Sequence, residues 1–311
     1  MKQSVMRILI VASAVMVIAA GAVMADEETP IKGWKKSLSV DFTTTQAAYS
    51  DSWVGGEVGS FNWVSNLNGT AERQMSPKVN YSTKLRLSFG QTSTQDEETG
   101  DWSKPKKSTD LIDWDNLFRF TFHGYVDPYA AFRVEGKFLD ASEPRKKMYL
   151  TPLKLTESAG IARRFWERGE SEEVTSRLGF AVRQEIVKSV VYGLEEVPEG
   201  FVILGTESNT DTDGGLESVT DVIVQVNEKL KYTGKLTLYK ALYFSKKDDF
   251  VGTPEEDYWK AVDVNWESIV DANLTKIITV KFYLQLLYDK QVELKGRLKE
   301  TMGIGFTFKL W

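Results

Sequence analysis

The C-terminal stretch G303-I-G-F-T-F-K-L-W311 is the part of the sequence that decides the fold. Side chains of a β-strand alternate between its two faces. The large apolar residues of this stretch share one face: Ile304, Phe306, Phe308 and Leu310. Small or polar residues occupy the other face: Gly303, Gly305, Thr307 and Lys309. A strand with one apolar and one polar face is typical of a lipid-facing barrel wall.

The same alternation recurs along the chain in segments of strand length. These segments cover residues 38–43, 61–66, 84–89, 118–123, 130–138, 153–161, 177–185, 221–227, 236–245, 262–267 and 278–286. No comparable stretch has the 3.6-residue apolar period of a helix. The pattern predicts an all-β protein, a transmembrane antiparallel β-barrel of about 12 strands. A secreted β-sandwich or solenoid is the alternative, but it does not account for the C-terminal strand.

The connections between these segments alternate in length. The short ones are centred on Ser76-Pro77, Val126-Asp127-Pro128, Gly169-Glu170, Thr233-Gly234 and residues 271–273. The longer ones are residues 93–108, 142–152, 191–214 and 246–257, whereas 289–293 is short for its place in the series. Short periplasmic turns and longer outer loops are typical of outer-membrane barrels.

The N-terminal residues 1–25 have the composition of a cleaved signal peptide. Lys2 and Arg7 precede an almost unbroken apolar run, and small residues lead up to a cleavage site after Ala25. The apolar run is about 16 residues long, shorter than the roughly 20 that a membrane-spanning helix needs. We therefore expect export to the bacterial outer membrane, with residues 26–311 forming the barrel.

The composition excludes several classes of protein. With no Cys there is no disulfide framework and no thiolate site, and the single His123 leaves little for a zinc site. The net charge of −5, without a basic patch, does not favour nucleic acid as a partner. The chain has 9 Trp, 12 Tyr and 16 Phe residues, enough for the aromatic girdles of a membrane barrel. Neither a metal nor a cofactor is expected.

Two sets of motifs resemble known outer-membrane families. G33-W34, S50-D-S-W-V-G-G-E57, S60-F-N-W63 and N66-L-N-G69 resemble the N-terminal signature of an uncharacterised family of bacterial outer-membrane β-barrels. That resemblance implies fold and location and no chemistry. The spacing of Gly305, Phe308 and Leu310 resembles the C-terminal signal by which barrels are recognised for assembly, with Trp311 one residue beyond the usual terminal aromatic. The resemblance implies the barrel-assembly machinery and outer-membrane lipid as partners.

Charged residues on the polar faces are the candidate functional residues. The candidate pore-lining residues are Lys84, Arg86, Asp115, Arg119, Arg133, Glu135, Lys137, Arg177, Arg183 and Lys281. A water-filled lumen would leave these charges solvated, whereas a narrow lumen would require ion pairs, because burying an ion costs several kcal/mol. Twelve strands lie between filled eight-stranded barrels and open sixteen-stranded porins. We expect a porin-like passive channel for small solutes with a weak anion preference; the alternative is a closed structural barrel or a docking platform for an envelope partner.

An outer-membrane hydrolase is less favoured, and no enzymatic activity is expected. His123 is the only histidine, and it lies beside a predicted periplasmic turn with no Ser two residues away. The stretch N209-T-D-T-D-G-G215 resembles the start of a calcium loop, but Thr220 stands where a bidentate Glu would close it. This stretch is a weak calcium candidate in a predicted outer loop.

Overall fold

The computed structural model describes residues 33–49, 58–122, 124–143, 145–168, 172–197 and 200–309. Twelve strands form a closed antiparallel barrel. They are β1 (Lys35–Ala47), β2 (Ser60–Ser76), β3 (Val79–Thr94), β4 (Lys106–Phe120), β5 (Asp127–Gly136), β8 (Leu153–Arg168), β9 (Glu172–Val197), β10 (Gly200–Gln225), β11 (Leu230–Phe244), β12 (Val262–Asn273), β13 (Ile278–Tyr288) and β14 (Arg297–Lys309). The predicted all-β fold, antiparallel pairing and number of strands are confirmed.

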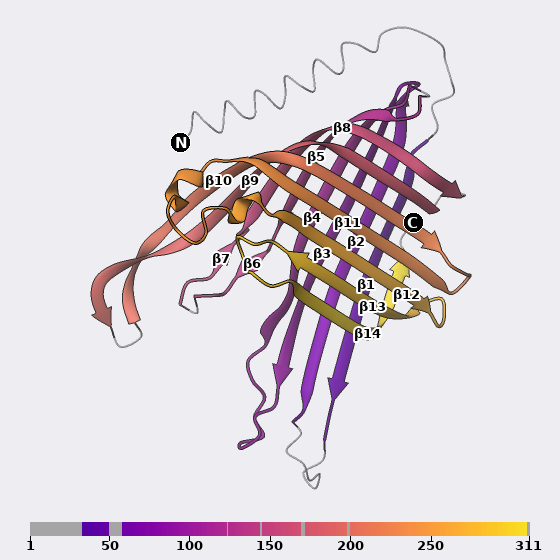
Figure 1. The fold of residues 1–311 in the computed structure, drawn as a ribbon. Helices are drawn as coiled ribbons and strands as arrows, with labels where there is room; N and C mark the ends of the chain where they lie inside the picture. The colour runs from indigo at the N-terminus through magenta and orange to yellow at the C-terminus, as the bar shows by residue number, and fades with distance from the viewer. Residues whose placement is uncertain are drawn as a thin grey trace.

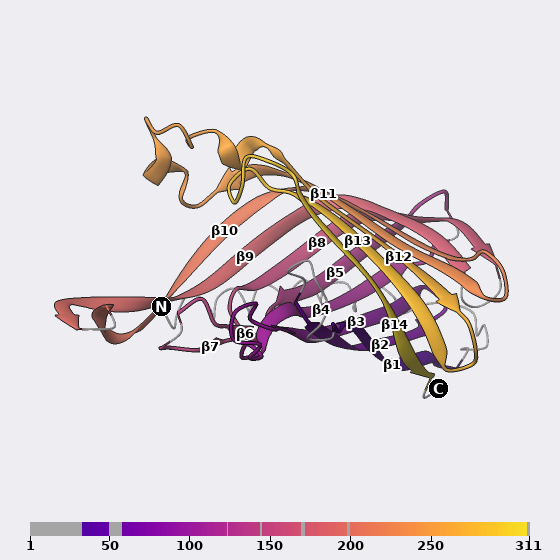
Figure 2. The ribbon, with the colours of Figure 1, turned by 90° about the horizontal axis from the view of Figure 1, so that it is seen from below.

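Each barrel strand pairs with its neighbour in sequence, and β1 pairs with β14 to close the barrel. One short hairpin, β6 (Leu139–Asp140) with β7 (Met148–Tyr149), interrupts the series between β5 and β8. Short turns at 77–78, 226–229 and 274–277 lie at one end, here called the turn end. Longer connections at 95–105, 137–152 and 245–261 lie at the other, the loop end. The strands slant around a common interior in two perpendicular views (Figures 1 and 2).

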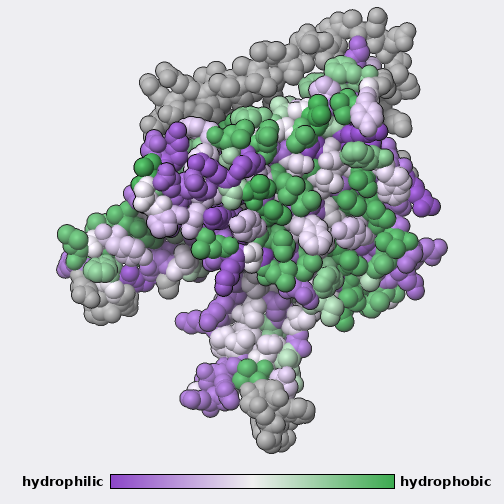
Figure 3. Space-filling view, viewed as in Figure 1, coloured by the Kyte–Doolittle hydropathy of each residue, from purple (hydrophilic) through white to green (hydrophobic). Residues whose placement is uncertain are grey.

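The barrel wall is apolar outside and polar inside. On β4, Trp114 is 42% exposed, whereas its neighbours Asp113 and Asp115 are 3% and 7% exposed. Other large apolar side chains exposed on the strands include Phe42, Leu178, Phe180, Leu216, Leu242, Trp266, Leu298, Met302, Ile304 and Phe306. Hydrophobic side chains gather over the face of the wall seen in Figure 3. This polarity is that of a barrel wall in contact with lipid.

None of the helical segments among the described residues is long and apolar enough to cross a membrane. Residues 1–25, with the predicted cleavage site, lie outside the described residues.

The seam between β1 and β14 requires two glycines of the C-terminal strand. Gly305 pairs with Thr43 across the seam, and a methyl group on Gly305 would collide with the carbonyl oxygen of Phe42. A methyl group on Gly303 would collide with the side chain of Thr43. Of the predicted assembly-signal residues, Gly305 is buried in this seam and Phe308 is 50% exposed. Leu310 and Trp311 lie outside the described residues.

Three predicted connections were misplaced. Thr233-Gly234 lies within β11, so the predicted turn there is wrong, and the turn falls at residues 226–229. Residues 271–273 are the end of β12, and the following turn is 274–277. Residues 191–214 were predicted to be an outer loop, but the described residues 191–197 belong to β9 and 200–214 belong to β10.

The two 26-residue strands β9 and β10 extend beyond the barrel as a two-stranded ribbon. Pairing of β9 with β8 ends at Ile186, and pairing of β10 with β11 begins at Asp213. The ribbon projects away from the wall in Figures 1 and 2. The 137–152 connection contacts the ribbon: Tyr192 donates to Glu143 at 2.6 Å, and Arg145 donates to the backbone carbonyl of Phe201 at 3.0 Å. The hydrogen bond from Tyr192, with others from Arg145, lowers the pKa of Glu143 to about 2, so the contact persists over the neutral range.

The connection from β11 to β12 folds back onto the interior wall at the loop end. It contains two short 3-10 helices, η1 (Lys247–Phe250) and η2 (Tyr258–Lys260). Trp259 of η2 packs against a buried cluster formed by Ala181, Tyr239 and Ala241. The ring of Trp259 also lies 6.3 Å from that of Phe244. This connection therefore narrows the loop end of the barrel on the side of β9 to β11.

Two adjacent residues at the middle of β14 test the assignment of the two faces. Met302 is 63% exposed on the wall, whereas Thr301 lines an interior chamber. Met302→Arg should cost about 2–4 kcal/mol of folding free energy in lipid vesicles, because it places a charge in the apolar belt. Thr301→Arg should cost clearly less. Urea unfolding followed by heat-modifiable gel mobility measures both, and a larger cost for Thr301→Arg would show that the faces are reversed.

Candidate functional site

The strand register brings charged side chains together on the inner face of the barrel. Residues 84, 86, 113, 115, 133 and 135 alternate with outward-facing residues along β3, β4 and β5. Arg86 pairs with Asp113 across β3 and β4, and Lys84 pairs with Asp115. Asp115 in turn pairs with Arg133 of β5. Because paired residues point to the same face of a sheet, basic and acidic side chains are neighbours across three adjacent strands.

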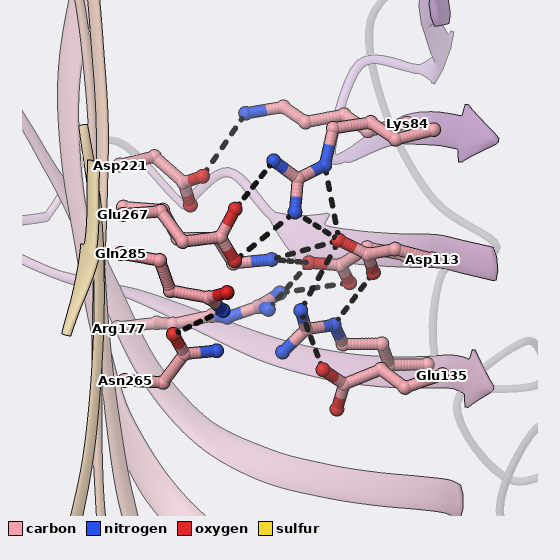
Figure 4. A network of polar contacts seen from close by, with 12 residues as sticks. Lys84, Asp113, Glu135, Arg177, Asp221, Asn265, Glu267 and Gln285 are labelled. Atoms are coloured by element: carbon pink, nitrogen blue, oxygen red, sulfur yellow. Dashed lines mark hydrogen bonds and ion pairs between the residues drawn. The ribbon is translucent and has the colours of Figure 1, made fainter. Parts of the chain in front are cut away.

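Other ion pairs cross the interior. The guanidinium of Arg86 donates to Glu267 of β12 at 2.8 Å and to Asp113 at 2.7 Å. Four strands lie between β3 and β12 in the closed order, so the contact from Arg86 to Glu267 spans the lumen. Figure 4 shows Glu267 and Asp113 approaching from opposite walls.

Two more contacts span the lumen in the direction of the turn end. Arg177 of β9 donates to Asp115 of β4 at 2.6 Å and 3.3 Å, although β5 and β8 separate these strands. Lys84 of β3 lies 3.6 Å from Asp221 of β10 (Figure 4). The lumen is therefore bridged at several positions by side chains alone.

Asp113 is the centre of this network. It accepts hydrogen bonds from Arg86 and from Arg133, the latter at 2.8 Å. Lys235 lies 3.9 Å from Asp113 and 3.6 Å from Asp115, and so joins the two carboxylates. We call the connected set the charged layer: Arg86, Asp113, Asp115, Arg133, Arg177, Lys235 and Glu267. Its carboxylates are 3–7% exposed, and each has at least one basic partner within 3 Å.

Cavities flank the charged layer on both sides. The turn-side chamber has a volume of about 380 Å³ and is lined by Lys84, Asp115, Arg119, Arg164 and Arg177 among others. The loop-side chamber, about 170 Å³, is lined by amide and hydroxyl side chains such as Asn62, Asn66, Ser88, Thr109 and Thr301. Arg86 and Glu267 line the loop-side chamber, and Asp113 borders neither. The layer therefore lies between two polar chambers of the lumen.

The candidate pore-lining residues fall into distinct environments. Arg86, Asp115, Arg133 and Arg177 belong to the charged layer, and Glu135 pairs with Arg133 at 2.9 Å. Lys281 pairs with Asp41 at 2.9 Å and lines the loop-side chamber. Arg183 pairs with Asp213 at 2.8 Å and Asp263 at 3.0 Å, near Trp259 at the loop end. Lys84 and Arg119 line the turn-side chamber.

Two observations bear on that prediction. Lys137 follows the last residue of β5 and is exposed, so it does not belong to the paired interior. Arg119, Arg133 and Arg177 are 8%, 5% and 5% exposed, which matches the narrow lumen, one of the two alternatives, and not the water-filled one. In this lumen Arg177 of β9 reaches Asp115 of β4, and Arg133 pairs with Asp113 of the adjacent strand.

Sequence reasoning missed three members of the charged layer. Asp113 lies on the same face of β4 as Asp115, but the alternation of apolar residues in β4 was recognised only from residue 118 onward. Lys235 was missed because a turn was predicted at Thr233-Gly234, immediately before it. Glu267 was placed on the polar face of its segment, but nothing in the sequence indicates that a strand so distant in the chain faces Arg86.

The calcium candidate does not lie in a loop. Residues 209–215 form part of β10, and Asp213 accepts hydrogen bonds from Arg183 and Tyr239. Asp211 is paired with Lys246. Across the described ranges, no three His, Cys, Asp or Glu side chains gather to form a metal site. His123 lies outside those ranges.

Residues 32–141 match the family described as "Protein of unknown function (DUF3078)". The predicted resemblance to an uncharacterised family is confirmed in this general form. A comparison with curated proteins found no match.

Several solved barrels resemble the fold at low identity. The COG4313 outer membrane channel from Pseudomonas putida F1 is 12% identical, with a TM-score of 0.36 over 91% of this chain and 96% of that one. The translocator domain of the autotransporter NalP from Neisseria meningitidis is 12% identical, with a TM-score of 0.30 over 99% and 98%. The NanC porin is 10% identical, with a TM-score of 0.35 over 88% and 100%. Likeness at this level carries no information on what this chain does.

Removing the carboxylate of Asp113 tests whether water is excluded from the charged layer, as its burial indicates. Asp113→Ala leaves Arg86, Arg133 and Lys235 without their shared partner, and should destabilise the barrel by about 3–5 kcal/mol. Asp257→Ala is the control, because it breaks an ion pair with Lys260 in which the two side chains are 71% and 53% exposed. The control should change stability by at most about 1 kcal/mol. Equal, small effects in urea unfolding would mean that water already solvates the layer.

Proposed function

We propose that this protein is an integral outer-membrane barrel that acts as a narrow channel for small solutes, closed in mid-lumen by the charged layer. The observation that carries the proposal is the arrangement of two polar chambers on either side of a layer made of side chains only. All described residues that line the two chambers belong to strands of the barrel wall. Rearranging a few side chains would therefore join them into one path.

The physical chemistry of the layer suits a constriction better than a wide pore. Each buried ion costs several kcal/mol to desolvate and is retained only because its partners compensate. A small charged solute can replace one partner while it passes, whereas an apolar solute cannot. Twelve strands also give a barrel intermediate between filled and open ones. These considerations favour passage of small polar or ionic solutes over general porin-like leakage.

The charge balance of the layer supports the weak anion preference expected from the sequence. Four of its members are basic (Arg86, Arg133, Arg177 and Lys235) and three are acidic (Asp113, Asp115 and Glu267). Low-dielectric walls focus the field of such an excess along the passage.

The location in the outer membrane rests on the apolar exterior and on the sequence of the N-terminus. The exposed apolar side chains of the wall match what outer-membrane lipid would cover. Assembly through the C-terminal strand fits the position of Gly305 and Phe308 in β14, which closes the barrel against β1. In this proposal, the signal peptide directs the export of the chain towards the outer membrane.

Opening the layer without changing its net charge tests the channel. The double variant Arg86→Ala with Glu267→Ala removes both partners of a contact that spans the lumen, and Asp113 keeps Arg133 and Lys235. We expect the wild type to show small single-channel currents in planar bilayers and the double variant to conduct several-fold more. The matched control, Asp257→Ala with Lys260→Ala, should conduct like the wild type. Folded proteins without channel events in either the wild type or the double variant would overturn the proposal.

Topology is tested by cysteine labelling, for which the chain is suited because it contains no cysteine. Leu194→Cys on the ribbon and Glu98→Cys in the β3–β4 connection should react with an impermeant maleimide on intact cells. Lys276→Cys, in a turn at the opposite end, should react only after lysis. Labelling of Lys276→Cys alone would invert the orientation in the membrane.

A docking platform is the second candidate, and the ribbon of β9 and β10 favours it. Residues 187–197 and 200–212 pair with each other and, among the described strands, with no barrel strand. A two-stranded sheet is marginal alone, and free strand edges recruit further strands. Leu194 is fully exposed on the ribbon, and Glu195 and Glu207 are exposed acidic residues. An extended, basic segment of an envelope protein fits such an edge, and a platform of this kind predicts no currents in the bilayer experiment.

A further inference from the structure

Arg119 is a buried arginine of the lumen whose carboxylate neighbour lies beyond hydrogen-bonding distance. It lies on β4 near the turn end, lines the turn-side chamber and is 8% exposed. Its Nε makes no hydrogen bond within the described part of the chain; the same holds for the Nε of Arg164 and Arg177, but their other guanidinium nitrogens donate to carboxylates. The carboxylate of Asp127 lies next to Arg119. The distance between Arg119 Nε and Asp127 Oδ2 is 3.7 Å, which is too long for a hydrogen bond.

Five other arginines on the inner face are paired closely. Each has a carboxylate oxygen between 2.6 and 2.9 Å from a guanidinium nitrogen: Arg86, Arg133, Arg164, Arg177 and Arg183. A buried charge without such a partner keeps most of its desolvation cost. Arg119 therefore lies in a site that lacks an acceptor.

Two carboxylates of the chamber, those of Glu72 and Glu173, are committed to other groups. Glu72 accepts hydrogen bonds from Asn80 at 3.0 Å and from Arg164 at 3.2 Å. Glu173 lies 3.3 Å from Arg164 and 3.6 Å from Lys84. Seven basic and six acidic side chains line the chamber, so a basic charge is left in excess. Among the described residues, no hydrogen bond supplies the Nε of Arg119 with an acceptor; Glu172 Oε2, elsewhere in the lining, is also buried without a partner.

We propose that the turn-side chamber is a binding site for a small organic anion bearing a phosphate or carboxylate group, held by the guanidinium of Arg119. A guanidinium presents a planar fork of donors that matches these groups bidentately. The chamber volume of about 380 Å³ falls within the range of pockets that enclose small ligands. The site goes beyond the proposed channel, because equilibrium binding does not require the layer to open.

The experiment measures binding to the full, refolded barrel in detergent by isothermal titration calorimetry. The probe is glycerol 3-phosphate, and glycerol is the neutral match. We expect the wild type to bind glycerol 3-phosphate and not glycerol, and Arg119→Gln to bind it at least about tenfold more weakly, a loss of roughly 1.4 kcal/mol. Lys276→Gln makes the same charge change at an exposed residue of the turn end that lines neither chamber, and should stay within about twofold of the wild type.

Stability without ligand supplies a second, independent measurement. Because Arg119 is a poorly compensated buried cation, Arg119→Gln should unfold at the same or a higher urea concentration than the wild type. Arg177→Gln, which leaves Asp115 without its partner at 2.6 Å, should unfold at a clearly lower one. Equal binding by wild type and Arg119→Gln, absence of binding by the wild type, or a strong destabilisation by Arg119→Gln would each overturn the proposal. Failure of conductance alone would leave it standing.

Discussion

Closure of the barrel through β1 and β14 is the constraint on which the rest of the structure depends. A sheet in lipid has no water to satisfy the backbone groups of an open edge, so each edge must be paired. Here the final strand meets the first, with Gly303 and Gly305 allowing the two backbones to approach. Closure then brings walls from distant parts of the chain face to face. The pairs of the charged layer that span the lumen, such as Arg86 with Glu267, exist only because of this encounter.

The layer, in turn, explains why an acidic chain can have so many charges inside a membrane barrel. Each of its carboxylates has at least one basic partner, and Asp113 has three. Such pairs add little net stability compared with apolar packing, but breaking one is costly. The consequence is a lumen with a defined closed arrangement and two polar chambers. The charge of Arg119 is incompletely compensated, because the carboxylate of Asp127 lies beyond hydrogen-bonding distance.

The sequence predicted the features that depend on local alternation and failed where pairing is not local. Each alternating segment corresponds to a barrel strand, because outward apolar and inward polar residues follow the two-residue period. Thr233-Gly234 resembles a turn, but Gly234 lies in β11, where the ring of Tyr232 packs over it. Residues 191–214 contain Asn, Asp and Gly and were expected to form a loop, yet they pair as a ribbon. Which inward charges meet was not predictable, since Arg86 and Glu267 are 181 residues apart.

That separation has a consequence for how the barrel forms. A contact between residues so far apart is available only after most strands have been added and the walls have curved towards each other. Arg86 and Asp113 lie opposite each other on the adjacent strands β3 and β4, so their pair can form as soon as these strands meet. The pair of Arg86 with Glu267 of β12 has to wait until the two walls face each other. The ion pair between Arg86 and Glu267, which spans the lumen, is therefore formed only when the barrel is nearly complete.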